Sequence, residues 1–115
     1  MIDRHWIRVT PVDQVPVREG RVALVGGREI AVFNLGDRWL AIDNRCPHKG
    51  GPLADGIVAG HAVVCPLHAW KIDLASGSVV RPADGGACLG SYPIELVDGM
   101  VLIGLPADAR KHEAA

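Results

Sequence analysis

Two short segments, each with one cysteine and one histidine, constrain this chain more than any other feature of its sequence. Cys46 and His48 flank a single proline in the first segment, and Cys65 and His68 flank two residues in the second. Sixteen residues separate His48 from Cys65, and nearby proline and glycine mark both segments as loops. Two thiols and two imidazoles, supplied pairwise from two loops, indicate a four-ligand metal site. The rest of the chain must then be a scaffold that brings the two loops together.

Size and composition leave room for one domain and exclude several classes of protein. The 115 residues include 49% hydrophobic and 22% charged side chains, as in ordinary globular domains. We expect a single domain over residues 1–106 and a polar tail over residues 107–115. A net charge of −1 gives no basic footprint for nucleic acid, and no apolar run approaches the ~20 residues needed to cross a bilayer. The first residues lack the apolar core of a signal peptide, so we expect a cytoplasmic protein with reduced cysteines.

Alternating apolar residues and regularly spaced turn dipeptides predict an all-β fold, a small sandwich or barrel. Gly26-Gly27 and Asp98-Gly99 each lie between two apolar runs and predict tight hairpin turns. The strands of this fold are expected at residues 6–9, 21–25, 28–34, 38–42, 92–97 and 100–104. The second, third and fourth of these should form a meander.

Between residues 43 and 84 the regular pattern gives way to short apolar runs separated by glycine and proline. Residues 61–65 and 70–74 are apolar enough to pair as a short hairpin across the second Cys/His segment. Residues 75–78 predict a turn, and residues 81–86 predict a third irregular loop. Both Cys/His segments therefore fall in the loop-rich part of the chain.

An iron–sulfur cluster and a zinc ion both suit two cysteines and two histidines. In Rieske-type [2Fe–2S] centres, two histidines replace two cysteines on one of the irons. Because the ligand types alternate along this chain, each loop can give one thiolate to the first iron and one imidazole to the second. Zinc modules more often place both cysteines on one knuckle and both histidines later, on a helix. The alternation favours the cluster, and a structural zinc-binding module remains the alternative from another class.

The paired motif resembles that of the Rieske-type [2Fe–2S] ferredoxin family, and the likeness extends over nearly the whole chain. The resemblance implies an antiparallel β sandwich or barrel with a small cluster-binding subdomain at about residues 43–84. It also implies one [2Fe–2S] cluster, bound by Cys46, His48, Cys65 and His68, and a third loop that covers it.

The chain departs from the respiratory-complex type of Rieske protein around its second histidine. That type has two further cysteines that form a disulfide, and a serine and a tyrosine that donate hydrogen bonds to sulfur. This chain has Leu67, Trp70 and Ile72 at corresponding positions. Because fewer hydrogen bonds to the sulfurs leave the reduced cluster less stabilised, the resemblance implies a reduction potential low in the Rieske range.

Two low-potential subfamilies are similar to this chain. Residues 53–58, 67–73 and 88–93 look most like the small subunit of assimilatory NAD(P)H-dependent nitrite reductase. That resemblance implies a large partner subunit with flavin, siroheme and a [4Fe–4S] cluster, in an assembly that reduces nitrite to ammonium. The alternative is the ferredoxin component of an aromatic-ring-hydroxylating dioxygenase, whose partners are a reductase and an oxygenase.

Several reactive side chains outside the motif are expected to have ordinary roles. We expect Cys88 to be a small buried residue near the third loop, and Lys49 to be a solvated loop residue. His5, His61 and His112 have no thiol partner at metal spacing and are expected at the surface. The sequence has no nucleophile–base pair or phosphate-binding glycine motif, so we expect an electron-transfer subunit that does not itself convert a substrate.

Overall fold

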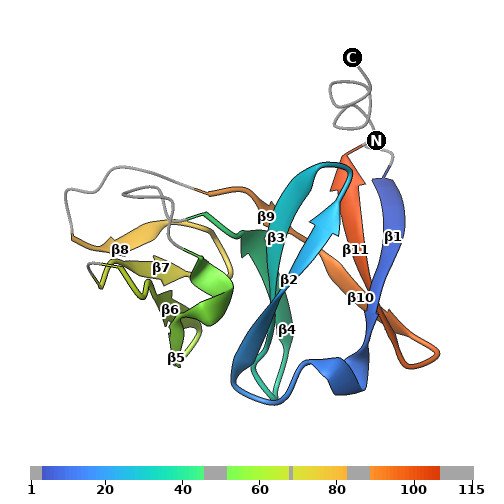
Figure 1. Ribbon diagram of the computed structural model, residues 1–115, viewed down its shortest axis with the longest axis horizontal. Coiled ribbons are helices and arrows are strands. Elements are labelled where there is room, and N and C mark those ends of the chain that lie inside the picture. Colours follow the sequence, from blue (N-terminus) through green and yellow to red (C-terminus); the bar gives the residue numbers. More distant parts are fainter. Residues whose placement is uncertain (1–3, 46–51, 68, 83–88, 107–115) are drawn as a thin grey trace.

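The computed structural model of the protein describes residues 4–45, 52–67, 69–82 and 89–106 (Figure 1). The described residues form eleven strands and two single-turn 3₁₀ helices. In chain order the elements are β1 (Arg4–Pro11), η1 (Val12–Gln14), β2 (Glu19–Val25), β3 (Arg28–Asn34), β4 (Trp39–Asp43), η2 (Leu53–Asp55), β5 (Ile57–Ala59), β6 (Ala62–Val64), β7 (Lys71–Asp73), β8 (Val79–Arg81), β9 (Ser91–Tyr92), β10 (Ile94–Val97) and β11 (Met100–Pro106). Within these ranges, no helix is long and apolar enough to span a bilayer.

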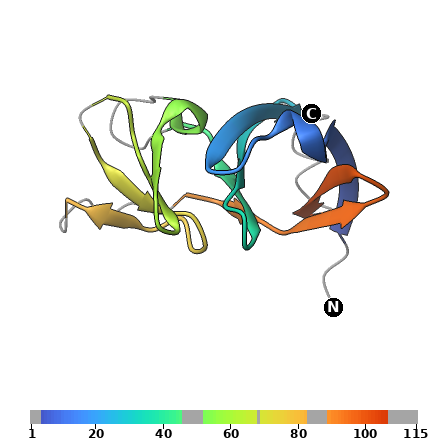
Figure 2. The same ribbon diagram turned by 90° about the horizontal axis from the view of Figure 1, so that it is seen from below.

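Antiparallel pairing arranges the strands into three sheets. The first contains β1, β11 and β10 in this order, the second β2, β3, β4 and β9, and the third β5, β6, β7 and β8. The second sheet lies between the other two, so the short-stranded third sheet is attached at one end of a β sandwich (Figure 1, Figure 2). This arrangement confirms the predicted all-β antiparallel fold.

Two hairpins turn where the sequence predicted them. Gly26 and Gly27, between β2 and β3, have φ of 55° and 81°. Asp98 and Gly99, between β10 and β11, have φ of 52° and 76°. Positive φ at both central residues defines a type I′ turn, whose twist matches that of the flanking strands. The expected meander of β2, β3 and β4 and the short hairpin of β6 and β7 are also confirmed.

The single strand expected over residues 92–97 is wrong, because Pro93 divides it in two. β9 pairs with β4 in the second sheet, whereas β10 pairs with β11 in the first. Proline has no N–H for a strand ladder, and here its carbonyl oxygen accepts a hydrogen bond from the Gly104 N–H at 3.0 Å. The chain crosses between sheets at this point. Strands β5 and β8, which extend the predicted hairpin of β6 and β7 on either side, were not expected.

β3 is buried on both faces and divides the interior into two cores. Val32 belongs to the core shared with the first sheet, which also contains Ile103. Its neighbour Phe33 belongs to the core shared with the third sheet, together with Ile72 and Cys65. Successive residues of a strand point to opposite faces, so one strand supports both cores. The second core therefore fixes the position of Cys65 relative to the sandwich.

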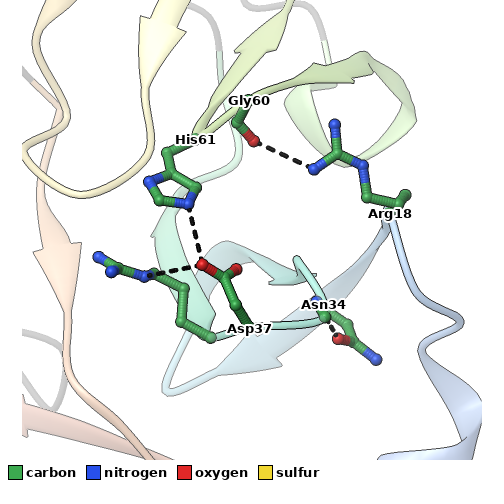
Figure 3. A network of polar contacts seen from close by, with 7 residues as sticks. Arg18, Asn34, Asp37, Gly60 and His61 are labelled. Atoms are coloured by element: carbon green, nitrogen blue, oxygen red, sulfur yellow. Dashed lines mark hydrogen bonds and ion pairs between the residues drawn. The ribbon is translucent and has the colours of Figure 1, made fainter.

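Polar contacts at the surface also join the third sheet to the second (Figure 3). His61 Nε2 lies 3.3 Å from Asp37 Oδ2, and Arg18 Nη1 donates to the Gly60 carbonyl oxygen at 3.3 Å. The His61 side chain is 43% exposed, in agreement with its expected place at the surface. Exposed polar contacts of this kind add little to stability. The shared apolar core, rather than these contacts, holds the two sheets together.

Candidate metal centre

The second Cys/His segment is a tight loop that joins β6 to β7. The Cys65 N–H donates to the Trp70 carbonyl oxygen at 2.7 Å, which closes the loop at its base. Ala69 has a φ of 59°, a left-handed conformation that turns the chain back toward β7. Pro66 and Leu67 are exposed, whereas Cys65 is only 2% exposed. The loop thus presents its tip to solvent and keeps its thiol inside.

The Cys65 sulfur accepts a hydrogen bond from the backbone of its own loop. The Leu67 N–H donates to Sγ of Cys65 at 3.4 Å. Backbone N–H donors of this kind stabilise the negative charge of a metal-bound thiolate. Cys65 therefore fits the role of a cluster ligand, both in its burial and in the donor that it receives.

The first Cys/His segment begins and ends at two residues that pair with each other. Arg45 and Pro52 form an isolated antiparallel bridge, so the chain leaves β4 and returns beside itself. Cys46 and His48 fall between these two residues and outside the described part of the chain. Leu53, immediately after the bridge, packs in the same core as Cys65. The base of the first loop is thereby joined to the base of the second.

Asn44 holds the base of the first loop, and sequence reasoning missed it. It is 2% exposed. Its Oδ1 accepts from the Ala54 N–H at 2.8 Å, and its Nδ2 donates to Glu29 Oε1 at 3.2 Å. Its backbone N–H donates to the Glu29 carbonyl at 3.0 Å, and its backbone carbonyl accepts from the Leu53 N–H at 2.7 Å. Asn44 therefore ties the two ends of the loop to each other and to β3. The only sequence signal was a polar residue directly after an apolar strand.

The residues that follow the third loop, Leu89 and Gly90, form hydrogen bonds on two sides. The Leu89 N–H donates to the Gly77 carbonyl oxygen at 2.8 Å, in the turn that follows β7. On the other side, Asp43 Oδ2 accepts from the Gly90 N–H at 2.9 Å, and the Asp43 N–H donates to the Gly90 carbonyl at 3.0 Å. Asp43 and Asn44, adjacent at the end of β4, thus anchor the first and third loops together.

Tyr92 reinforces the anchor at Asp43. Its hydroxyl donates to Asp43 Oδ1 at 2.6 Å and accepts from Arg28 Nη1 at 3.2 Å. Burial raises the pKa of Tyr92 to about 12, with further contributions from the hydrogen bond and the charge of Asp43, and Arg28 opposes this shift. At neutral pH the Tyr92 hydroxyl is therefore protonated and able to donate.

The described residues include one of the four predicted ligands. His68 lies outside them, like Cys46 and His48, and so do the predicted bystanders Cys88 and Lys49. Within the described ranges no three His, Cys, Asp or Glu side chains come together as a metal site. The complete ligand set therefore stays a prediction, supported by the geometry at Cys65 and by the closed bases of both loops.

Two of the residues that depart from the respiratory type pack in the core that contains Cys65. Ile72 is fully buried, and the half-buried Trp70 packs against the same core. The Ile72 side chain has no group that could donate to sulfur. The reduction potential low in the Rieske range stays a prediction, which rests on the rule that hydrogen bonds to the sulfurs raise the potential.

Two Cys/His loops with joined bases beside a β sandwich are the arrangement expected of an iron–sulfur protein of the Rieske type. The chain matches the Rieske [2Fe-2S] domain over residues 5–93 and belongs to this family. It is therefore an electron-transfer protein with one [2Fe–2S] cluster, which when bound takes up and releases single electrons. Family membership favours the predicted cluster over the zinc alternative.

The proteins similar to this chain include ferredoxins of oxygenase systems and small subunits of nitrite reductases. The anthranilate 1,2-dioxygenase ferredoxin subunit of Burkholderia cepacia is 33% identical over 97 residues, 84% of this chain and 89% of its own length. The ferredoxin component of the alkene monooxygenase system of Xanthobacter autotrophicus is 31% identical over 113 residues, 97% of this chain and 91% of its own. A solved structure from Mycobacterium tuberculosis, assigned as an NADH-dependent nitrite reductase small subunit, has a TM-score of 0.81 and 22% identity, covering 90% of this chain and 96% of that one. At that identity the structural likeness concerns the fold alone.

Proposed function

We propose that this protein is the small subunit of an assimilatory NAD(P)H-dependent nitrite reductase. Its partner in this proposal is a large subunit with flavin, siroheme and a [4Fe–4S] cluster, and the assembly reduces nitrite to ammonium. The small subunit contributes one-electron transfer through its Rieske cluster.

The observation that carries this proposal is where the subfamily resemblance falls in the fold. Residues 53–58, which resemble the nitrite reductase small subunit, include the backbone groups bound by Asn44. Residues 67–73 span the later part of the second ligand loop and β7, and residues 89–93 contain the groups bound by Asp43. A likeness concentrated around the cluster loops supports the proposal, because these residues tune the cluster and shape the surface beside it.

We further propose Cys46, His48, Cys65 and His68 as the cluster ligands, within a subdomain at about residues 43–84. Replacement of His48 or His68 by Cys should shift the EPR spectrum of the reduced protein toward the all-thiolate type and lower the potential, provided that the cluster assembles. Iron and acid-labile sulfide should each be present at about two per chain. A colourless protein with stoichiometric zinc would refute the ligand assignment in favour of a structural zinc module.

A second candidate function is the ferredoxin component of an oxygenase system. The specific observation in its favour is that the relatives with 33% and 31% identity are ferredoxins of this kind. In that role the partners would be a reductase and a terminal oxygenase instead of a siroheme enzyme.

Reconstitution with each candidate partner distinguishes the two functions. The large nitrite reductase subunit from the same genome should reduce nitrite with NADH or NADPH at least tenfold faster when this protein is added. A terminal oxygenase and its reductase from the same genome should gain nothing from it. Turnover of the oxygenase, with no effect on nitrite reduction, would replace the first function by the second.

A further inference from the structure

The outer face of the third sheet carries a row of side chains that cluster binding does not explain. The strand registers place Ile57 opposite Val64, Val64 opposite Lys71, and Lys71 opposite Arg81. Directly opposite residues share one face of a sheet. The neighbouring row packs against the core and so marks the inner face: Val58, Val63, Ile72 and Val79. The row of Ile57, Val64, Lys71 and Arg81, here called the outer row, therefore faces away from that core.

A β-bulge brings Arg81 into the outer row. Ile72 pairs with Val79, so regular pairing would set Val80 opposite Lys71 and turn Arg81 to the inner face. An extra residue in β8 instead places Arg81 opposite Lys71. Bulges re-aim side chains in this way and are frequent beside functional sites.

The resulting pair of cations is unfavourable for the isolated chain. Like charges directly opposite each other on a sheet are destabilising. Within the described ranges neither Lys71 nor Arg81 forms an ion pair, whereas Arg21, Arg38 and Arg45 each lie within 3.0–3.8 Å of a carboxylate. The cost would be offset by a partner that supplies the missing negative charge.

The outer row is amphipathic and borders the second ligand loop. Ile57, at its apolar end, is 72% exposed. Val64 directly precedes Cys65, and Lys71 is the first residue of β7 after the loop. Leu67, in the loop itself, is 44% exposed. A protein docked on this row would therefore lie beside the second ligand loop.

We propose that the outer row is a docking surface for an acidic face of the redox partner. Carboxylates of the partner would neutralise Lys71 and Arg81, and an apolar side chain would cover Ile57. This inference rests on the proposed role in delivering electrons to a larger enzyme. Two copies that met through the same row would bring their cationic pairs together, so charge decides against a symmetric contact between copies of this chain.

Electron transfer to ferricyanide tests the cationic end of the row without any protein partner. The reduced cluster gives one electron to ferricyanide, an anion, which becomes ferrocyanide. At low ionic strength Arg81→Glu should slow this reaction by about fivefold, because cationic steering is lost. Arg8→Glu is the matched control, since Arg8 is also an exposed strand arginine but lies in β1.

The control should change the ferricyanide rate by less than about twofold, and the gap between the two variants should disappear in ~1 M salt. Unchanged EPR spectra would show that both variants retain an intact cluster. Equal slowing by both variants would overturn the proposal for Lys71 and Arg81.

Binding to the purified large nitrite reductase subunit tests the apolar end. Ile57→Ser should weaken binding by about tenfold and leave the ferricyanide rate unchanged, while Leu24→Ser, at a residue that is 77% exposed on β2, should alter neither. Equal effects of these two substitutions on binding would show that Ile57 is not part of the docking surface. The variants could show the expected ferricyanide pattern while the wild-type protein supports no nitrite reduction with the large subunit. That result would uphold the cationic part of the docking surface and refute the proposed function.

Discussion

Among single residues, Asn44 makes the most direct hydrogen bonds to the ends of a ligand loop. Asn44→Ala removes the acceptor for the Ala54 N–H and the donor to Glu29. Because a buried donor is left without a partner, the free energy of unfolding should fall by about 1–3 kcal/mol. The first loop should also lose its geometry, so the visible absorbance of the cluster should bleach faster and the EPR g values should shift.

Asn34→Ala is the matched control for this prediction. The Asn34 side chain also makes two hydrogen bonds, but at the opposite end of β3: its Nδ2 donates to the Val15 carbonyl oxygen and its Oδ1 accepts from the Gly36 N–H, each at 2.9 Å. It should lower stability without a change in the g values. Equal spectral changes in both variants would show that Asn44 has no specific role in positioning the loop.

Because of Tyr92, the stability of the fold should fall as the pH rises through the alkaline range. Its pKa is raised from 10.0 to about 12 in the folded protein. Because the folded value is the higher one, the contribution of Tyr92 is fully present below pH ~10 and is lost as the pH rises through ~12. Tyr92 is the only tyrosine of the chain, so tyrosinate absorbance reports on it alone.

We expect that absorbance to titrate near pH ~12 in the folded protein. Tyr92→Phe should be less stable at neutral pH by about 0.5–1.5 kcal/mol, since the hydrogen bond to Asp43 is lost. Its melting temperature should then fall less steeply than that of the wild type between pH ~10 and ~12. Titration of the wild-type absorbance at the ordinary tyrosine pKa would contradict the structural assignment.

Among the elements, the turn after β7 depends on the absence of a side chain at Gly77. Gly77 has a φ of 80°, and a Cβ there would clash with the Leu89 carbonyl oxygen. Gly77→Ala should therefore combine left-handed strain with displacement of the residues that lead out of the third loop. We expect a loss of more than about 3 kcal/mol in the free energy of unfolding, measured with urea.

Gly60→Ala is the control for Gly77→Ala, because it adds the same backbone strain without a steric clash. Gly60 has a φ of 61°, but a Cβ there would meet nothing within 4 Å. It should therefore cost only the strain of a left-handed residue, about 1–2 kcal/mol. Similar losses at both glycines would mean that the turn can move away from Leu89.

For the molecule as a whole, the two cores on either side of β3 should have separable effects on the cluster. Ile72 and Ile103 are both fully buried, one in each core. Ile72→Val and Ile103→Val remove the same methylene group, so each should cost about 0.5–1.5 kcal/mol. Only Ile72→Val, in the core of Cys65, should broaden the EPR signal or speed cluster loss.

Much of the fold and the kind of cofactor follow from local chemistry. The ligand types and their alternation between two loops favoured a Rieske cluster over zinc, because each loop can supply both irons. Gly26-Gly27 and Asp98-Gly99 predicted their hairpins, because a type I′ turn needs residues that accept positive φ. Period-two alternation predicted the meander for a similarly local reason: it depends only on neighbouring side chains.

Tertiary structure decided what depends on residues far apart in the chain. The double burial of β3, the change of sheets at Pro93 and the role of Asn44 all arise from contacts across many intervening residues. The bulge that sets Arg81 beside Lys71 follows from pairing between two strands, and neither strand shows it alone. The chemistry of the ligands can be predicted from residue types and spacing, whereas the orientation of a loop base or of a charged row requires the folded neighbours that hold it.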